Sequence, residues 1–172
     1  MHRKRRRTGA SFGLAHTLAR VTVGALFIGH GLRKLVPVLG GGGLDAATAQ
    51  MDGLGLHPAR ANAVAAAGTQ AAGGALLAVG LLTPLAAAVV AANMIVVMRT
   101  SCAGKGPWGV DGGWEYPLVL TAAALALAEH GPGPLSLDRA LGRERSGTGA
   151  AAAALATALA GSAGVLAARP PR

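Results

Sequence analysis

The chain has 172 residues, of which 52% are apolar, 3% are aromatic and 13% are charged. Alanine occurs 40 times and glycine 27 times, whereas an ordinary soluble domain carries about 25% charged residues. The apolar content excludes a wholly disordered chain, and the single cysteine, Cys102, excludes a disulfide scaffold. An alanine-rich soluble helical protein and a small polytopic membrane protein remain as candidate classes.

The net charge of +9 is concentrated at the N-terminus, where Arg3–Arg7 form an unbroken basic run. Outside this run the chain has 11 basic and 7 acidic side chains. They form no basic stripe interleaved with aromatic residues, so the charge does not indicate nucleic-acid binding. A basic run directly before a long apolar segment is typical of a cytoplasmic anchor for a first membrane span.

Five apolar stretches follow one another, separated by glycine, proline and charged residues. They cover Phe12–Val38, Ala61–Leu82, Leu85–Met98, Tyr116–Ala128 and Ala150–Ala168. A helix needs about 20 residues to cross a bilayer, which the second stretch provides by itself and the third and fourth provide only with their polar ends. The segment 45–56 is predicted to be a short interfacial helix. The fifth stretch is predicted as a further span or, because alanine contributes little insertion energy, as a surface helix.

We therefore predict an all-α polytopic membrane protein, a four-helix bundle with an additional C-terminal apolar helix. Three regions are expected: a basic cytoplasmic segment, a transmembrane four-helix domain, and a linker followed by the alanine-rich helix, over residues 1–11, 12–142 and 143–172. A signal peptide is the alternative for the first stretch, but Arg20 and the lack of a small-residue cleavage site favour a retained helix.

The predicted orientation follows from the basic residues. If Arg3–Arg7 hold the N-terminus in the cytoplasm, segments 40–58 and 100–114 lie outside, and residues 83–84 and 131–149 lie inside. The inner side then also holds three further arginines, Arg139, Arg143 and Arg145. This agrees with the excess of basic residues in cytoplasmic loops of membrane proteins.

One face of the predicted first helix carries Arg20, Gly24, Phe27, Gly31 and Lys34, at helical spacing. Ionisable groups within a membrane usually face the interior of the bundle and mark function. For Arg20, extension toward the cytoplasmic headgroups is an equally good interpretation. For Lys34, a place at the outer interface is the favoured alternative.

The fourth predicted helix begins at Glu115, in the segment Gly112-Gly113-Trp114-Glu115-Tyr116-Pro117. A carboxylate is stabilised at a helix N-terminus, so a well-formed helix start at the membrane surface explains this residue. The alternative hypothesis is that Glu115 pairs with Arg99, Lys34 or Arg20 in a buried polar site. In that case Glu115→Gln should impair folding or activity.

Cys102 is a candidate redox thiol in an outer loop, because Lys105 nearby would favour its thiolate. An incidental cysteine at the interface is the favoured alternative. The five histidines form no i, i+4 pair or Cys/His cluster, so no metal site is predicted. No phosphate loop, nucleophile elbow or dinucleotide motif is present, and the chain has no self-contained catalytic constellation.

Several short motifs in a fixed order resemble the DoxX family. They are Arg20, Phe27, Gly31-Leu32-Arg33-Lys34-Leu35, Gly73-Gly74-Ala75-Leu76-Leu77, Gly80-Leu81-Leu82-Thr83-Pro84, Gly113-Trp114-Glu115-Tyr116-Pro117-Leu118 and Gly131-Pro132-Gly133-Pro134-Leu135-Ser136-Leu137-Asp138. The resemblance extends over about three quarters of the chain, from Ala15 to Leu141.

The resemblance implies a four-helix integral protein of the cell inner membrane. Some members of the family are subunits of thiosulfate:quinone oxidoreductase, and others belong to membrane redox or detoxification complexes. We therefore expect an accessory or quinone-facing oxidoreductase subunit, with a quinone as its candidate cofactor. A redox protein is the expected partner within the lipid bilayer, and a homo-oligomer is an open alternative. A structural membrane protein or a small-solute carrier is the alternative function.

The candidate polar site comprises Arg20, Lys34, Gln70, Arg99 and Glu115, which would orient a quinone head or a small anion. Gln70 stands where the family often carries a glutamate before its Gly-Gly pair. Glutamine keeps hydrogen bonding but cannot act as a general acid or base at neutral pH. The segment 99–102 likewise replaces a histidine that is common in the family after the third helix.

Overall fold

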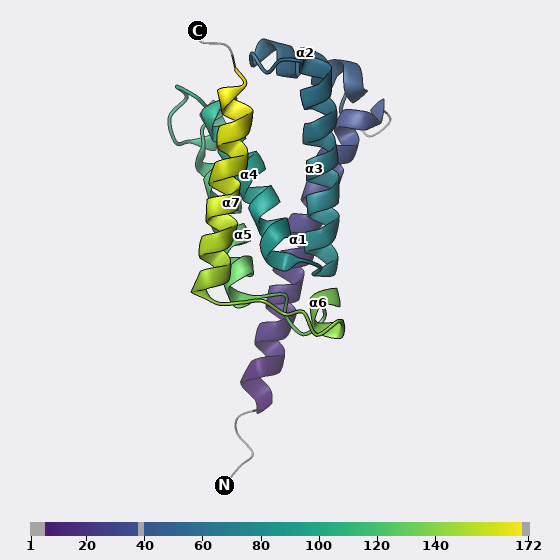
Figure 1. The fold of residues 1–172 in the computed structure, drawn as a ribbon, viewed down its shortest axis with the longest axis vertical. Helices are drawn as coiled ribbons and strands as arrows, with labels where there is room; N and C mark the ends of the chain where they lie inside the picture. The colour runs from purple at the N-terminus through teal and green to yellow at the C-terminus, as the bar shows by residue number, and fades with distance from the viewer. Residues whose placement is uncertain (1–5, 38–39, 170–172) are drawn as a thin grey trace.

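The computed structural model describes residues 6–37 and 40–169, with side chains from residue 13 onward. This part of the chain is helical, without strands, which confirms the all-α prediction (Figure 1). Most of the basic run Arg3–Arg7 lies outside the described residues. The α-helices are α1 (Arg6–Leu35), α2 (Gly43–Gly53), α3 (Ala59–Val79), α4 (Thr83–Arg99), α5 (Glu115–His130), α6 (Leu137–Ala140) and α7 (Thr148–Ala167).

Each predicted apolar stretch forms a helix, and the short helix expected over residues 45–56 forms as α2. The break between α3 and α4 follows from local chemistry. Gly80 ends α3 in the left-handed region, with φ +67°, and Leu81 N donates to Leu76 O at 2.9 Å. This arrangement satisfies the last carbonyl groups of a helix. Pro84 then lies in the first turn of α4, where its missing N–H is not needed.

The helices form a bundle in which α4 is central. Helix α1 packs along α3, while α4 contacts α3, α5 and α7. Figure 1 shows α2 across one end of the bundle, with the C-terminal end of α7 nearby, and α6 toward the opposite end, from which the start of α1 projects. The core lies between α1, α4 and α5 and includes Phe27, Val90 and Leu127.

Helices α1 and α3 touch through their backbones. A Cβ atom at Gly24 would lie 2.5 Å from Gly74 O, and one at Gly31 would lie 2.6 Å from Ala67 O. Both distances are shorter than any real Cβ contact, so only glycine fits at these positions. Small residues that allow such close helix approach are typical of helix pairs in membranes.

Apolar side chains cover much of the outer surface of the bundle. Among the helices of the described ranges, α7 alone combines the length and the mean hydropathy of a typical membrane span, while α4 is apolar but shorter. Polar residues such as Asn62 and Gln70 lower the hydropathy of α3, although it is long enough. Only 17% of the apolar window in α7 is buried, so its apolar surface faces outward, unlike a core helix of a soluble protein.

Candidate functional site

Arg20 joins α1 to the loop that precedes α6. Its side chain is 1% exposed. The guanidinium donates hydrogen bonds to the backbone oxygens of Pro132 and Leu135. The Arg20 side chain is thus buried against this loop, at the end of the bundle that contains α6. Its cationic fork is used to hold two backbone carbonyl groups of a neighbouring loop.

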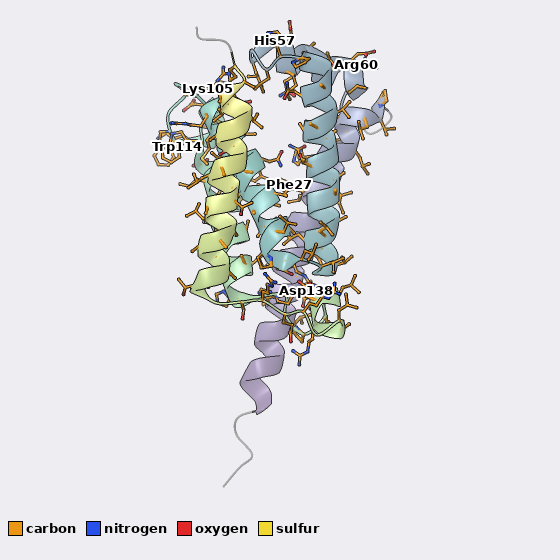
Figure 2. All side chains as sticks on the ribbon, in the orientation of Figure 1. Phe27, His57, Arg60, Lys105, Trp114 and Asp138 are labelled. Atoms are coloured by element: carbon orange, nitrogen blue, oxygen red, sulfur yellow. The ribbon has the colours of Figure 1, made fainter. Side chains whose placement is uncertain are left out.

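Asp138 occupies the same end of the bundle and closes the start of α4 (Figure 2). Its carboxylate accepts hydrogen bonds from Leu82 N at 2.8 Å, and from Thr83 N and Thr83 Oγ1 at 2.9 Å. Asp138 N in turn donates to Gly80 O at 2.8 Å. The first N–H groups of a helix have no hydrogen-bond acceptor within the helix. Here the acceptor is a buried carboxylate that lies 55 positions away in the sequence.

Lys34 and Gln70 form a second polar centre, between α1 and α3. Lys34 Nζ donates to Gln70 Oε1 at 2.9 Å and lies 3.4 Å from His30 O. Gln70 is 7% exposed. The structure thus brings together two of the five predicted site residues. No Asp or Glu side chain in the described residues pairs with Lys34.

Two cavities meet at this pair. The first, here called the α1–α5 cavity, has a volume of about 460 Å³ and is lined mainly by apolar residues, among them Phe27, Met94, Val97, Pro117 and Leu120. The second, here called the α3–α7 cavity, has a volume of about 290 Å³ and lies between α2, α3, α4 and α7. Lys34 and Gln70 line both cavities, so the pair forms part of the wall between them.

Of the other predicted site residues, only Cys102 shares a cavity with Lys34 and Gln70 in the described part of the chain. Arg20 precedes Lys34 by fourteen residues of continuous helix, which is about 21 Å along α1. Arg99 is exposed at the end of α4. Cys102 is 7% exposed and lines the α1–α5 cavity, so it is more enclosed than a loop position suggested.

Glu115 lies at the exposed start of α5, as expected from the helix-start interpretation of the sequence. The side chain is exposed, and its Oε1 accepts a hydrogen bond from Gly109 N at 2.7 Å. It forms no ion pair with Arg20, Lys34 or Arg99 in the described part of the chain. The carboxylate closes the turn before α5, and it does not belong to a buried polar site.

Glu115→Gln is accordingly expected to fold like the parent protein, because the amide oxygen still accepts from Gly109 N. The free energy of unfolding should change by no more than about 0.5 kcal/mol. The measurement is the apparent melting temperature in detergent, which should shift only slightly. Glu115→Ala, which removes the acceptor, should cost about 1 kcal/mol. A large loss of folded protein with Glu115→Gln would restore the buried-site hypothesis.

Sequence reasoning missed Asp138 as a structural centre. The residue ended a motif, Ser136-Leu137-Asp138, but nothing in its local pattern indicated the partner helix. Asn93, Ser162 and Thr69, which line the α3–α7 cavity, were also missed. A polar residue within each of three apolar stretches was the available signal, because buried or membrane-embedded polar groups need partners.

Comparison with known proteins identifies the family to which the chain belongs. The DoxX family model matches residues 15–101, half of the chain, and this range includes Arg20, Lys34 and Gln70. No curated protein and no solved structure matches the chain. The family match agrees with the apolar outer surface of the bundle and with the order of motifs in the sequence. The chain belongs to the DoxX family and is a membrane protein of the DoxX type.

Proposed function

We propose that this protein is a multi-pass protein of the cell inner membrane and a quinone-facing accessory subunit of a membrane redox system. Its transmembrane domain would comprise residues 12–142, with α1, α3, α4 and α5 as four spans and α7 as a fifth. The observation that carries the redox role is the Lys34–Gln70 pair in the wall of the mainly apolar α1–α5 cavity.

The residues of this cavity fit a quinone head. A cavity of about 460 Å³ falls within the usual range of small-molecule sites, about 300–1,000 Å³. Lys34 Nζ has three N–H donors and gives one to Gln70 Oε1, and the Gln70 amide has two N–H donors of its own. Apolar walls with a few placed donors suit a flat ring bearing two carbonyl oxygens.

Each residue of the pair has a distinct role. Lys34 donates to a carbonyl oxygen of the ligand, and Gln70 orients the Lys34 ammonium by accepting one of its hydrogens. A bound quinone supplies the capacity to take up electrons and protons. Cys102 lines the same cavity, and a partner redox protein is the proposed source of the electrons.

The proposed orientation places the end with α6 in the cytoplasm. Arg139, Arg143 and Arg145 lie in or beside the segment between α5 and α7, at the end from which the start of α1 projects (Figure 1). The C-terminal end of α7 lies near α2, at the opposite end. A reporter fused after Arg172 should be active on the outside. An inside location would argue for four spans and against α7 as a fifth.

Lys34→Met is expected to lose bound quinone, because removal of a charged donor costs about 1.5–3 kcal/mol. That corresponds to a tenfold or greater loss of affinity. The measurement is the quinone content of protein purified in mild detergent, followed by binding of added quinone. Lys105→Met, in the exposed loop before α5, is the matched control and should retain quinone.

The quinone-binding measurement also distinguishes the redox proposal from the alternative function. Parent protein that holds no quinone, and that transfers no electrons with any co-purifying partner, would contradict the redox proposal. A structural membrane protein or a small-solute carrier would then be the better description.

A further inference from the structure

The α3–α7 cavity has a mainly apolar lining, but it includes several polar side chains that the quinone proposal does not use. Five lining residues have uncharged polar side chains that donate to a backbone carbonyl of the preceding helical turn. They come from three helices and the turn after α4, and are Asn62, Thr69, Asn93, Thr100 and Ser162. Many outward-facing residues of the same helices are apolar, for example Leu159, which is 51% exposed. The polar residues therefore gather on the cavity side of the bundle.

The hydrogen bonds of these side chains decide what the cavity can accept. Asn93 Nδ2 donates to Val89 O at 2.9 Å, and Thr69 Oγ1 donates to Ala65 O at 2.8 Å. Ser162 Oγ likewise donates to Leu159 O at 3.0 Å. Asn62 and Thr100 follow the same pattern, each donating to a carbonyl of the residue four positions earlier.

Because these donors are engaged within their own helices, the side chains have acceptor capacity left. An asparagine whose Nδ2 binds a carbonyl keeps its Oδ1 for another partner. Hydrocarbon chains cannot donate to such oxygens, and an unsatisfied carbonyl costs free energy in an apolar environment. Water can donate to them, and a cavity of about 290 Å³ holds several water molecules.

The cavity also extends from the end of the bundle to its interior. Gln50 of α2 and Ser101, just after α4, line it at the α2 end, while the buried Gln70, near the middle of α3, lines its inner part. Lys34, near the end of α1, also lines it. Figure 1 shows α2 across this end, and α7 and α3 on either side of α4. Lys34 has no acidic partner among the described side chains, and water would also hydrate its ammonium group.

We infer that the α3–α7 cavity is an aqueous vestibule, through which water and small hydrophilic solutes reach the Lys34–Gln70 pair from the α2 end. The solutes it favours carry N–H or O–H groups, which meet the acceptor oxygens of Asn93 and Ser162. The vestibule meets the α1–α5 cavity at the Lys34–Gln70 pair. It does not depend on a quinone there.

Cysteine accessibility tests this inference in membrane vesicles. In a Cys102→Ala background, single cysteines are placed in the cavity wall by Ser162→Cys and Asn93→Cys. The probe is sulfonatoethyl methanethiosulfonate, which is charged and does not cross membranes. Lys105→Cys, in the exposed loop at the α2 end (Figure 2), marks the side from which the reagent arrives, so the test requires no assumption about orientation.

The matched controls are apolar, outward-facing positions on the same bundle. Leu159→Cys lies on α7 one turn from Ser162, and Ala72→Cys lies on α3 and is exposed. Cysteines that the small reagent has not blocked are afterwards labelled with maleimide-polyethylene glycol, which shifts the protein on a gel. The cavity cysteines are expected to show no such shift, because the small reagent has already blocked them. This blocking should occur from the same side as for Lys105→Cys, and Leu159→Cys and Ala72→Cys should keep the shift.

Three outcomes would overturn the inference: no blocking at cavity positions while Lys105→Cys reacts, equal blocking at Leu159→Cys, or blocking only from the opposite side. Each variant must elute like the parent in detergent. If Asn93→Cys does not fold, Ala92→Cys, a milder change in the same wall, replaces it. Because reactivity is measured whether or not quinone is bound, this result and the quinone result can fail independently.

Discussion

Asp138→Ala is expected to cause the largest loss of stability of any single carboxylate removal in this protein. The change removes three hydrogen bonds at once and leaves Leu82 N and Thr83 N without their acceptor at the start of α4. Asp138 is 2% exposed, so water cannot replace it without opening this end of the bundle. Each unsatisfied buried group costs about 1–3 kcal/mol, and we expect a total of about 3–5 kcal/mol.

The measurement is the midpoint of thermal or denaturant-induced unfolding in detergent, with the fraction of monodisperse protein as a second readout. Asp138→Asn keeps one carbonyl oxygen and should lose less than Asp138→Ala. Asp111→Ala is the matched control, since Asp111 is an exposed carboxylate in the short 3-10 helix Gly109–Asp111. Its midpoint should match the parent, and an Asp138→Ala midpoint equal to that control would contradict the capping role.

Gly24→Val is expected to separate α1 from α3. A Cβ atom at this position would lie 2.5 Å from Gly74 O and 2.7 Å from Ala78 N, both of them backbone atoms. Backbone in a packed helix cannot rotate away as a flexible side chain can, so the helices must move apart. Overpacking of a tight interface costs about 1–3 kcal/mol, occasionally more, and we expect the upper part of this range.

The same displacement should disturb the polar centre. Lys34 lies on α1 and Gln70 on α3, and their hydrogen bond of 2.9 Å depends on the close approach of these helices. Gly24→Val is therefore expected to lower both the unfolding midpoint and any ligand binding at Lys34.

Gly29→Ala provides the control on the same helix. A Cβ atom there would meet nothing within 4 Å, and alanine is favoured over glycine in a helix by about 0.5–1 kcal/mol. We expect an unchanged or slightly raised midpoint. If Gly24→Val and Gly29→Ala behaved alike, the close helix contact would not be a determinant of the fold.

Helix positions could be predicted from the sequence because their signals are local. Apolar runs mark α1, α3, α4, α5 and α7, and Pro84 after Gly80 marks the one tight break between two of them. Capping and propensity act within a few residues. The family resemblance rests on the same local motifs, and the family model confirms it over residues 15–101.

The hydrogen-bond partners of the polar residues could not be predicted in the same way, because most of them lie far away in the chain. Lys34 and Gln70 were both candidates, but the hydrogen bond between them follows from helix packing across 36 positions. Arg20 was grouped with them by helical face alone, yet its partners are Pro132 and Leu135 at the other end of the bundle. For Glu115 the sequence left two interpretations open, a helix start and a pair with a basic residue, and the partner in the structure is a backbone N–H six positions away.

The sequence by itself determined the class of this protein: its helices, its apolar surface, its membrane family and the few charged residues that could matter. The tertiary structure decided how those charges are used, with Asp138 and Arg20 closing one end of the bundle and Lys34 and Gln70 forming a polar centre between two cavities. The physical reason is range. Hydrophobic pattern and capping are properties of short segments, but a buried polar group is satisfied only by whatever atoms the fold brings within about 3 Å.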